Sequence, residues 1–119
     1  MVVDAWEPFE RGAGTGEWII EPGVFPAFVF SDELMRFRSA LSEAGVMVPF
    51  DWTGWLDEEG RAIHETPGGV ESADLETLRK LLVAHVRNDR FTEGHLAGAV
   101  QDGHIGRIVS RVRELLQSD

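Results

Sequence analysis

Two segments near the C-terminus repeat apolar residues at the spacing of one helix face, and this pattern constrains the fold more than any other feature. In residues 72–88, beginning at Leu75, and again in residues 105–117, apolar side chains recur every three or four positions. That is the period of an amphipathic α-helix. We therefore expect two long helices that share one core. The side chains predicted to build it are Leu78, Leu82, Val86, Ile108, Val112 and Leu115.

The N-terminal half predicts a third helix and a β-hairpin. Ser31 is a suitable N-cap, and apolar residues follow it at helical spacing, so a helix is expected over residues 31–44. Residues 17–20 and 24–30 are rich in β-forming side chains and flank a Glu-Pro-Gly turn. Two such runs around a turn are typical of a hairpin.

Two further segments have weaker patterns. Asp51 is a candidate cap for a short helix over residues 52–64. Trp6 and Phe9 are apolar enough to dock on the body, but the glycine-rich run that follows them predicts a loop.

The expected fold class is mainly α with a small β-hairpin (α+β), in one compact helical domain. A chain of 119 residues is large enough for a single core but not for two. We expect one domain over residues 1–119, with residues 1–16 as a flexible N-terminal segment.

The turn after the first long helix carries the densest mixture of charged and aromatic groups. Arg87 and Arg90 fall where a helix C-terminus favours cations. Thr92 is a candidate N-cap for the next helix, which would pack Phe91 against Leu96 as a hydrophobic staple. We predict that this corner is a structural joint, with a buried phenyl ring and with arginine head groups that meet carboxylates or helix-end carbonyls.

The next helix is expected over residues 93–102. Gly94 and Gly98 are four positions apart and therefore share a face of that helix. Because glycine inside a helix costs about 1 kcal/mol relative to alanine, a close helix contact is expected at these glycines.

Composition excludes several classes of protein. The chain has no cysteine, so disulfides, thiolate metal sites and cysteine nucleophiles are absent. No apolar run approaches the roughly 20 residues of a membrane helix, and residues 1–10 do not resemble a signal peptide. We expect a cytoplasmic protein that does not bind membranes. Its single lysine against ten arginines is typical of a GC-rich bacterial genome.

The net charge of −10 argues against nucleic acid as a partner. Residues 1–78 hold 4 basic and 16 acidic residues, whereas residues 79–119 hold 7 basic and 5 acidic residues. The acidic body repels a phosphate backbone. Nucleic-acid regulation through the C-terminal arginines is therefore the least favoured interpretation.

No catalytic or cofactor motif is present. The glycines of residues 11–16 do not follow the pattern of a phosphate-binding loop, and no serine lies in a G-x-S-x-G turn. His85 and Asp89 have a spacing that metal ligands use, and His95 and His104 are further candidate bases. Because a protein zinc site needs at least three ligands in defined geometry, we predict no metal and no cofactor.

Six residues are candidates for binding a ligand or a partner. Arg87 and Arg90 suit an anion, while Glu93 and His95 suit acid–base chemistry beside it. The other two candidates, Trp52 and Trp55, can form an aromatic wall or fill the core, and we favour the core.

The C-terminal half resembles a known family. Residues 73–82, followed by Arg87, Arg90-Phe91, Glu93-Gly94-His95-Leu96 and Gly103, together with the upstream Phe50-Asp51-Trp52 and Trp55, resemble a family of small bacterial and archaeal proteins of unknown function. The resemblance spans about residues 17–117 and implies a shared fold. It implies no catalytic or binding residues.

The sequence thus favours a small non-enzymatic module that binds a protein partner or a second copy of itself. The alternative is a ligand-binding protein or an enzyme that acts on an anionic compound through Arg87, Arg90, Glu93 and His95.

Overall fold

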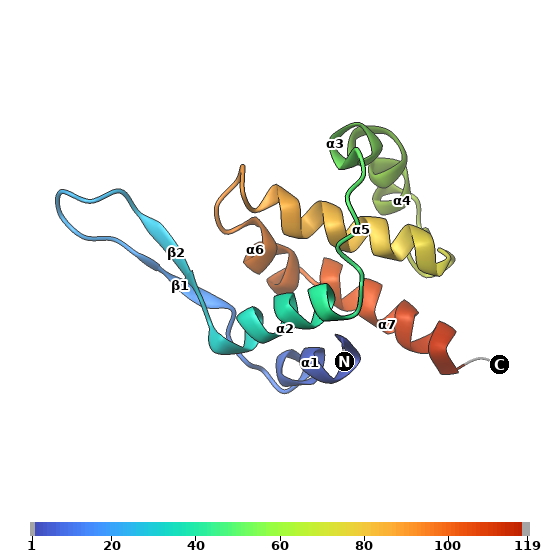
Figure 1. Cartoon of the computed structure of the whole chain (residues 1–119), viewed down its shortest axis with the longest axis horizontal. Helices are drawn as coiled ribbons and strands as arrows, with labels where there is room; N and C mark the ends of the chain where they lie inside the picture. The colour runs from blue at the N-terminus through green and yellow to red at the C-terminus, as the bar shows by residue number, and fades with distance from the viewer. Residues whose placement is uncertain (1, 118–119) are drawn as a thin grey trace.

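Helices dominate the computed structural model, which describes residues 2–117 except for the side chain of His64 (Figure 1). The prediction of a mainly α fold with one β-hairpin is confirmed. Among the described residues, no helix has the length and apolar character needed to cross a bilayer. In chain order the elements are α1 (Val2–Glu10), β1 (Gly16–Ile19), β2 (Ala27–Phe30), α2 (Asp32–Glu43), α3 (Trp52–Trp55), the π-helical segment η1 (Leu56–Gly60), α4 (Arg61–Glu65), α5 (Leu75–Asn88), α6 (His95–Gln101) and α7 (His104–Gln117).

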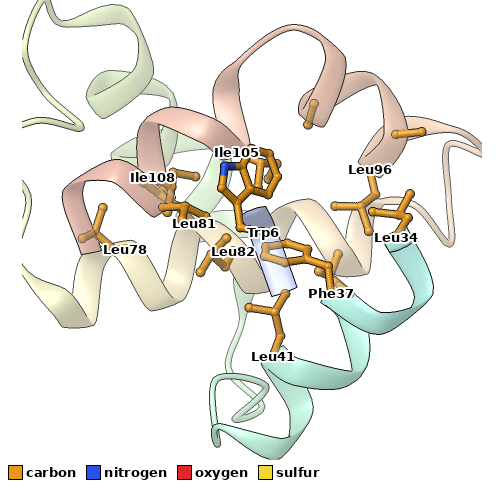
Figure 2. Close-up of a cluster of buried hydrophobic side chains, with 14 of the residues drawn as sticks. Trp6, Leu34, Phe37, Leu41, Leu78, Leu81, Leu82, Leu96, Ile105 and Ile108 are labelled. Atoms are coloured by element: carbon orange, nitrogen blue, oxygen red, sulfur yellow. The ribbon is translucent and has the colours of Figure 1, made fainter. Parts of the chain in front are cut away.

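The core lies where α5 meets α1, α2, α6 and α7 (Figure 2). Four of the six predicted core residues are buried, and Val112 and Leu115 are partly buried against them. Leu75 starts the same apolar pattern but is 48% exposed, because α5 begins there and its first turn extends past the core. The sequence did not place α2 in this core, although Leu34, Phe37 and Leu41 are fully buried in it.

Side-chain caps set where the two best-defined helices begin. Ser31 caps α2, since its hydroxyl accepts a hydrogen bond of 3.2 Å from the amide of Leu34. Helix α5 begins at residue 75 rather than at the predicted residue 72. There the carboxylate of Asp74 accepts a 2.8 Å bond from the amide of Thr77, while the hydroxyl of Ser72 donates to the carbonyl of Gly68.

The short helix expected over residues 52–64 is present as α3, η1 and α4 in direct succession. Asp51 occupies the N-cap position of α3 as predicted, but its side chain accepts no hydrogen bond from a backbone amide of the helix. Its carboxylate accepts a 3.1 Å bond from the hydroxyl of Thr53 instead.

The predicted hairpin forms from β1 and β2, which pair antiparallel with Trp18 opposite Phe28. Its two faces differ. Phe28 and Phe30 are partly buried and pack toward the core, whereas the alternate residue Val29 is 52% exposed. Figure 1 shows the hairpin extending away from the helices. We call residues 16–30 the arm.

A helix occupies most of the segment that the sequence predicted to be flexible. In α1, Trp6 is only 6% exposed, and its ring lies 5.3 Å from that of Phe37. Glu10 at the end of α1 accepts a 2.8 Å bond from Arg113 of α7. Docking of the indole therefore holds a segment too short to be a stable helix alone.

Candidate functional site

The corner between α5 and α6 does not form the predicted staple. Helix α6 begins at His95 rather than near residue 93, and its N-cap is Gly94 with a φ of +84°. The carboxylate of Asp89 caps the helix by accepting a 3.0 Å bond from the amide of Leu96. With the cap two residues later than expected, Phe91 is no longer beside the helix start. The ring is 74% exposed, so its predicted burial against Leu96 is wrong.

The structure explains why glycine is needed at one of the two positions where a helix contact was predicted. At Gly94, a Cβ would lie 3.0 Å from the indole of Trp18, and the positive φ disfavours other residues. At Gly98, a Cβ would meet nothing within 4 Å. The prediction of a close helix contact is therefore wrong at both glycines, since the contact at Gly94 is with strand β1.

The structure separates the six candidate residues into different surroundings. Arg87, Arg90 and Trp52 line one hollow, whereas Glu93 and His95 do not line it. Glu93 accepts a 3.1 Å bond from the backbone amide of Phe28 and so ties the corner to the arm.

Trp55 lies in the same short helix as Trp52 but does not line the hollow. Its ring packs 5.9 Å from Phe50, its indole nitrogen donates a 2.9 Å bond to Glu59, and the ammonium of Lys80 lies 6.0 Å from its ring. It is partly buried against the core, as favoured from the sequence, whereas Trp52 is not among the residues packed on the core and forms a wall of the hollow instead.

The hollow beside α3 has a volume of about 290 Å³ and combines cationic and aromatic walls. Trp52 and Phe91 form one wall, with their ring centroids 5.9 Å apart. Arg87 and Arg90 form another. Within residues 2–117 neither guanidinium makes an ion pair, so the pairing expected for their head groups with carboxylates is not found.

A second hollow of about 240 Å³ lies between α2 and α5 and shares Arg87 with the first. Arg38 also lines it, and the Arg38 guanidinium lies 5.1 Å from the ring of Phe30 at the base of the arm. The two hollows share Arg87 as a lining residue, and we refer to them together as the arginine groove. Arg38 was not among the predicted site residues, because its place beside Arg87 depends on how α2 packs on α5.

Three histidines from α5, α6 and α7 gather on the other side of the corner. The rings of His85 and His95 stack 5.3 Å apart, with Nδ1 of His85 3.1 Å from Nε2 of His95. His104 lies 6.1 Å from His85, ring to ring. Together with Gly98 and Asp102 they line a hollow of about 210 Å³.

Burial lowers the pKa of His95, and the neighbouring His104 lowers it further, while Asp89 acts in the opposite direction. The imidazole is therefore held neutral at a pH where an exposed histidine begins to take up a proton. Among the described residues, no group of three histidine or acidic side chains is arranged to hold a metal ion. The cluster is a packed polar contact between three helices.

The arm is the most exposed apolar feature of the molecule. Ile20, Val24 and Phe25 at its tip are 74%, 61% and 94% exposed. The sequence contained the signal for this exposure, since apolar residues around the turn of a hairpin are the farthest from the core.

Comparison with known families gives one match, to a family of unknown function, DUF6508, over residues 8–118. The match covers nearly the whole chain, so the chain belongs to this family, and the resemblance to a family of unknown function is confirmed. A search of curated proteins and a search of solved structures found no match.

Proposed function

We propose that this member of the family is a cytoplasmic, non-enzymatic protein-interaction module that self-associates through its arm. The observation that carries the proposal is the exposure of Ile20, Val24 and Phe25 on a projecting hairpin. Exposed apolar patches on a folded domain mark interaction sites. A phenyl ring that is 94% exposed gains by burial against a partner.

The backbone of the arm supports the same conclusion. A two-stranded ribbon has marginal stability in water, and each strand leaves one edge without a neighbouring strand within the described residues. Glu93 satisfies part of the β2 edge through the amide of Phe28. The tip has no such support, so contact with another protein chain stabilises it.

A second copy of the chain is the partner we favour. Most soluble oligomers are homo-oligomers, and a two-fold axis uses each contact twice. The arm contains Glu17 and Glu21 and no basic residue, while the arginine groove on the same chain is cationic. Each chain therefore carries an acidic arm and a cationic groove, and these two surfaces are complementary in charge.

Sedimentation of the full chain over a concentration series tests the proposal. We expect a mass above the 13.2 kDa monomer that rises with concentration. The double variant Ile20→Ser with Phe25→Ser removes the apolar tip and should be monomeric. Leu116→Ser is the matched control, because Leu116 is 57% exposed on α7, and it should associate like the wild type. A wild type that stays monomeric throughout contradicts the proposal.

The second candidate function is binding of, or catalysis on, a small anionic compound at the corner. The observation that favours it is the pair of guanidinium groups beside the rings of Trp52 and Phe91. Glu93 and His95 lie outside that hollow, which removes the acid–base pair from the scheme. A thermal-shift screen of phosphorylated and carboxylated metabolites tests it, with Arg87→Ala as the control that should lose any response.

A further inference from the structure

Three arginines in this acidic chain lie together without an acidic partner. The sequence has 21 acidic residues against 11 basic ones, so an arginine meets carboxylates easily. Arg79, Arg107 and Arg113 each pair with a glutamate. Within residues 2–117, the arginines that line the groove, which are Arg38, Arg87 and Arg90, make no such ion pair. Their positive charge remains available to an anionic partner.

The arm carries the opposite charge in a fixed pattern. Glu17 and Glu21 are both exposed and, within the described residues, neither makes an ion pair. Glu17 lies in β1, and Glu21 follows two residues after the end of that strand. At about 3.3 Å per extended residue, two positions four apart are separated by roughly 13 Å. The apolar tip continues directly from the second carboxylate.

The groove also offers an apolar surface of the kind that the tip needs. Phe91 is 74% exposed, and its ring lies beside that of Trp52 at the edge of the cationic hollow. Aromatic rings and arginines together are the residues that dominate protein interfaces. An acidic segment that ends in exposed aliphatic and aromatic side chains matches this surface in charge and in apolar character.

The tip of the arm lies away from the hollow that Arg87 and Arg90 line in its own chain, although Phe30 at the base of the arm contacts Arg38 of the other hollow. At its base, Glu93 binds the amide of Phe28, and Trp18 packs on Phe28 and against Gly94. Figure 1 shows the tip projecting far from α3, beside which the hollow with Arg87 and Arg90 lies. The groove is therefore open to the arm of another molecule.

We propose that the arm of one copy docks in the arginine groove of a second copy, and that the second arm does the same in return. This inference rests on the self-association proposed above and names its receptor surface. Glu17 and Glu21 face Arg87 and Arg90 across the contact, and Phe25 packs against the aromatic wall. The apolar tip supplies affinity, whereas the charges orient the arm and exclude other partners.

Charge reversal on each side tests the pairing. The groove variant is Arg87→Glu with Arg90→Glu, and the arm variant is Glu17→Arg with Glu21→Arg. In each homodimer both contacts then bring like charges together, so the dissociation constant should rise by about tenfold or more.

Mixing the two variants is the decisive measurement. In the mixed dimer, the acidic arm of the groove variant meets the normal groove of the arm variant. The arginine arm meets the reversed groove at the other contact, so both contacts are complementary. We expect the mixture to associate close to the wild-type affinity. Wild-type association of either variant alone, or no association of the mixture, overturns the arm-in-groove pairing.

A matched control separates local from overall charge. Arg36→Glu with Arg61→Glu changes the net charge by the same amount, at exposed positions that do not line the groove. This variant should associate like the wild type. If a reversal variant fails to fold by circular dichroism, the neutral pair Arg87→Gln with Arg90→Gln replaces it and should still weaken association.

The outcomes distinguish the two proposals. If the Ile20→Ser, Phe25→Ser chain is monomeric while both reversals associate normally, self-association stands and the groove is not the receptor. If the wild type is monomeric, both proposals fail. If the wild type is monomeric but inorganic phosphate raises its melting temperature and Arg87→Gln abolishes that shift, the groove belongs to a small anion instead.

Discussion

Removing the indole of Trp6 should destabilise the protein strongly, because this side chain is the main apolar contact of α1 with the body. Trp6 is 6% exposed, and its ring lies 5.0 Å from Phe9 and 5.3 Å from Phe37. On α7, a Cβ added to Gly106 would lie 3.3 Å from the indole. The indole therefore fills a space bounded by α2 and α7.

The magnitude follows from the buried area. A buried aromatic side chain removes about 150–250 Å² from water, which at about 25 cal/mol per Å² corresponds to roughly 4–6 kcal/mol. That figure is an upper value, because the unfolded chain already buries part of this surface. We expect Trp6→Ala to cost about 3–5 kcal/mol, in line with other aromatic-to-alanine changes in cores. This is a large part of the roughly 5–15 kcal/mol that stabilises a typical domain.

Urea denaturation followed by far-ultraviolet circular dichroism measures this loss without relying on tryptophan fluorescence. Phe91→Ala is the matched control. Its ring is 74% exposed, so the free energy of unfolding should fall by only about 1 kcal/mol. If Trp6→Ala costs no more than Phe91→Ala, α1 does not dock in solution and residues 1–16 behave as the flexible segment that the sequence suggested.

Four further predictions concern three individual positions and the net charge. Leu82→Ala, at a site 3% exposed, should cost about 2–5 kcal/mol in the same urea assay, whereas Leu75→Ala should cost much less. Gly94→Ala should destabilise by more than about 1 kcal/mol, because the φ of +84° and the nearby Trp18 both oppose a Cβ. Burial lowers the pKa of His95 in the folded protein, so the unfolded chain takes up the proton first as the pH falls below 6.5, the ordinary pKa of histidine. The free energy of unfolding should therefore fall with pH in that range. His95→Gln should reduce this dependence in urea titrations from about pH 8 to about pH 5. A gel-shift assay should detect no binding to duplex DNA at micromolar protein and physiological salt, because the net charge is −10.

Local patterns predicted the elements whose formation is decided locally. Each of these elements depends on neighbours within a few residues and is present: the apolar repeats of α5 and α7, the Ser31 cap, and the two β-rich runs around Glu21-Pro22-Gly23.

At the corner between α5 and α6, two residues could serve as the N-cap of α6. Thr92 is the better cap by residue type, but Gly94 takes the position, because its left-handed conformation lets Asp89 reach the amide of Leu96.

The arrangement of the site could not be predicted in the same way. Arg38 lies beside Arg87, and Glu93 binds the arm, only because α2, α5 and the hairpin pack as they do. Residue type told us that Arg87 and Arg90 suit an anion. Residue type did not predict that the ring of Phe91 would be exposed next to these two arginines rather than buried against Leu96.

The contact between α1 and α7 also has a consequence for the order of folding. Glu10 and Arg113 are 103 positions apart, and Thr15 receives a hydrogen bond from Gln101 across 86 positions. During synthesis, α1 leaves the ribosome before α7, yet one wall of the cavity for Trp6 is made by α7. Contacts of such long range form late, after the chain between them has been ordered. A nascent chain that has not yet completed α7 therefore leaves the side of the indole that faces Gly106 exposed to solvent.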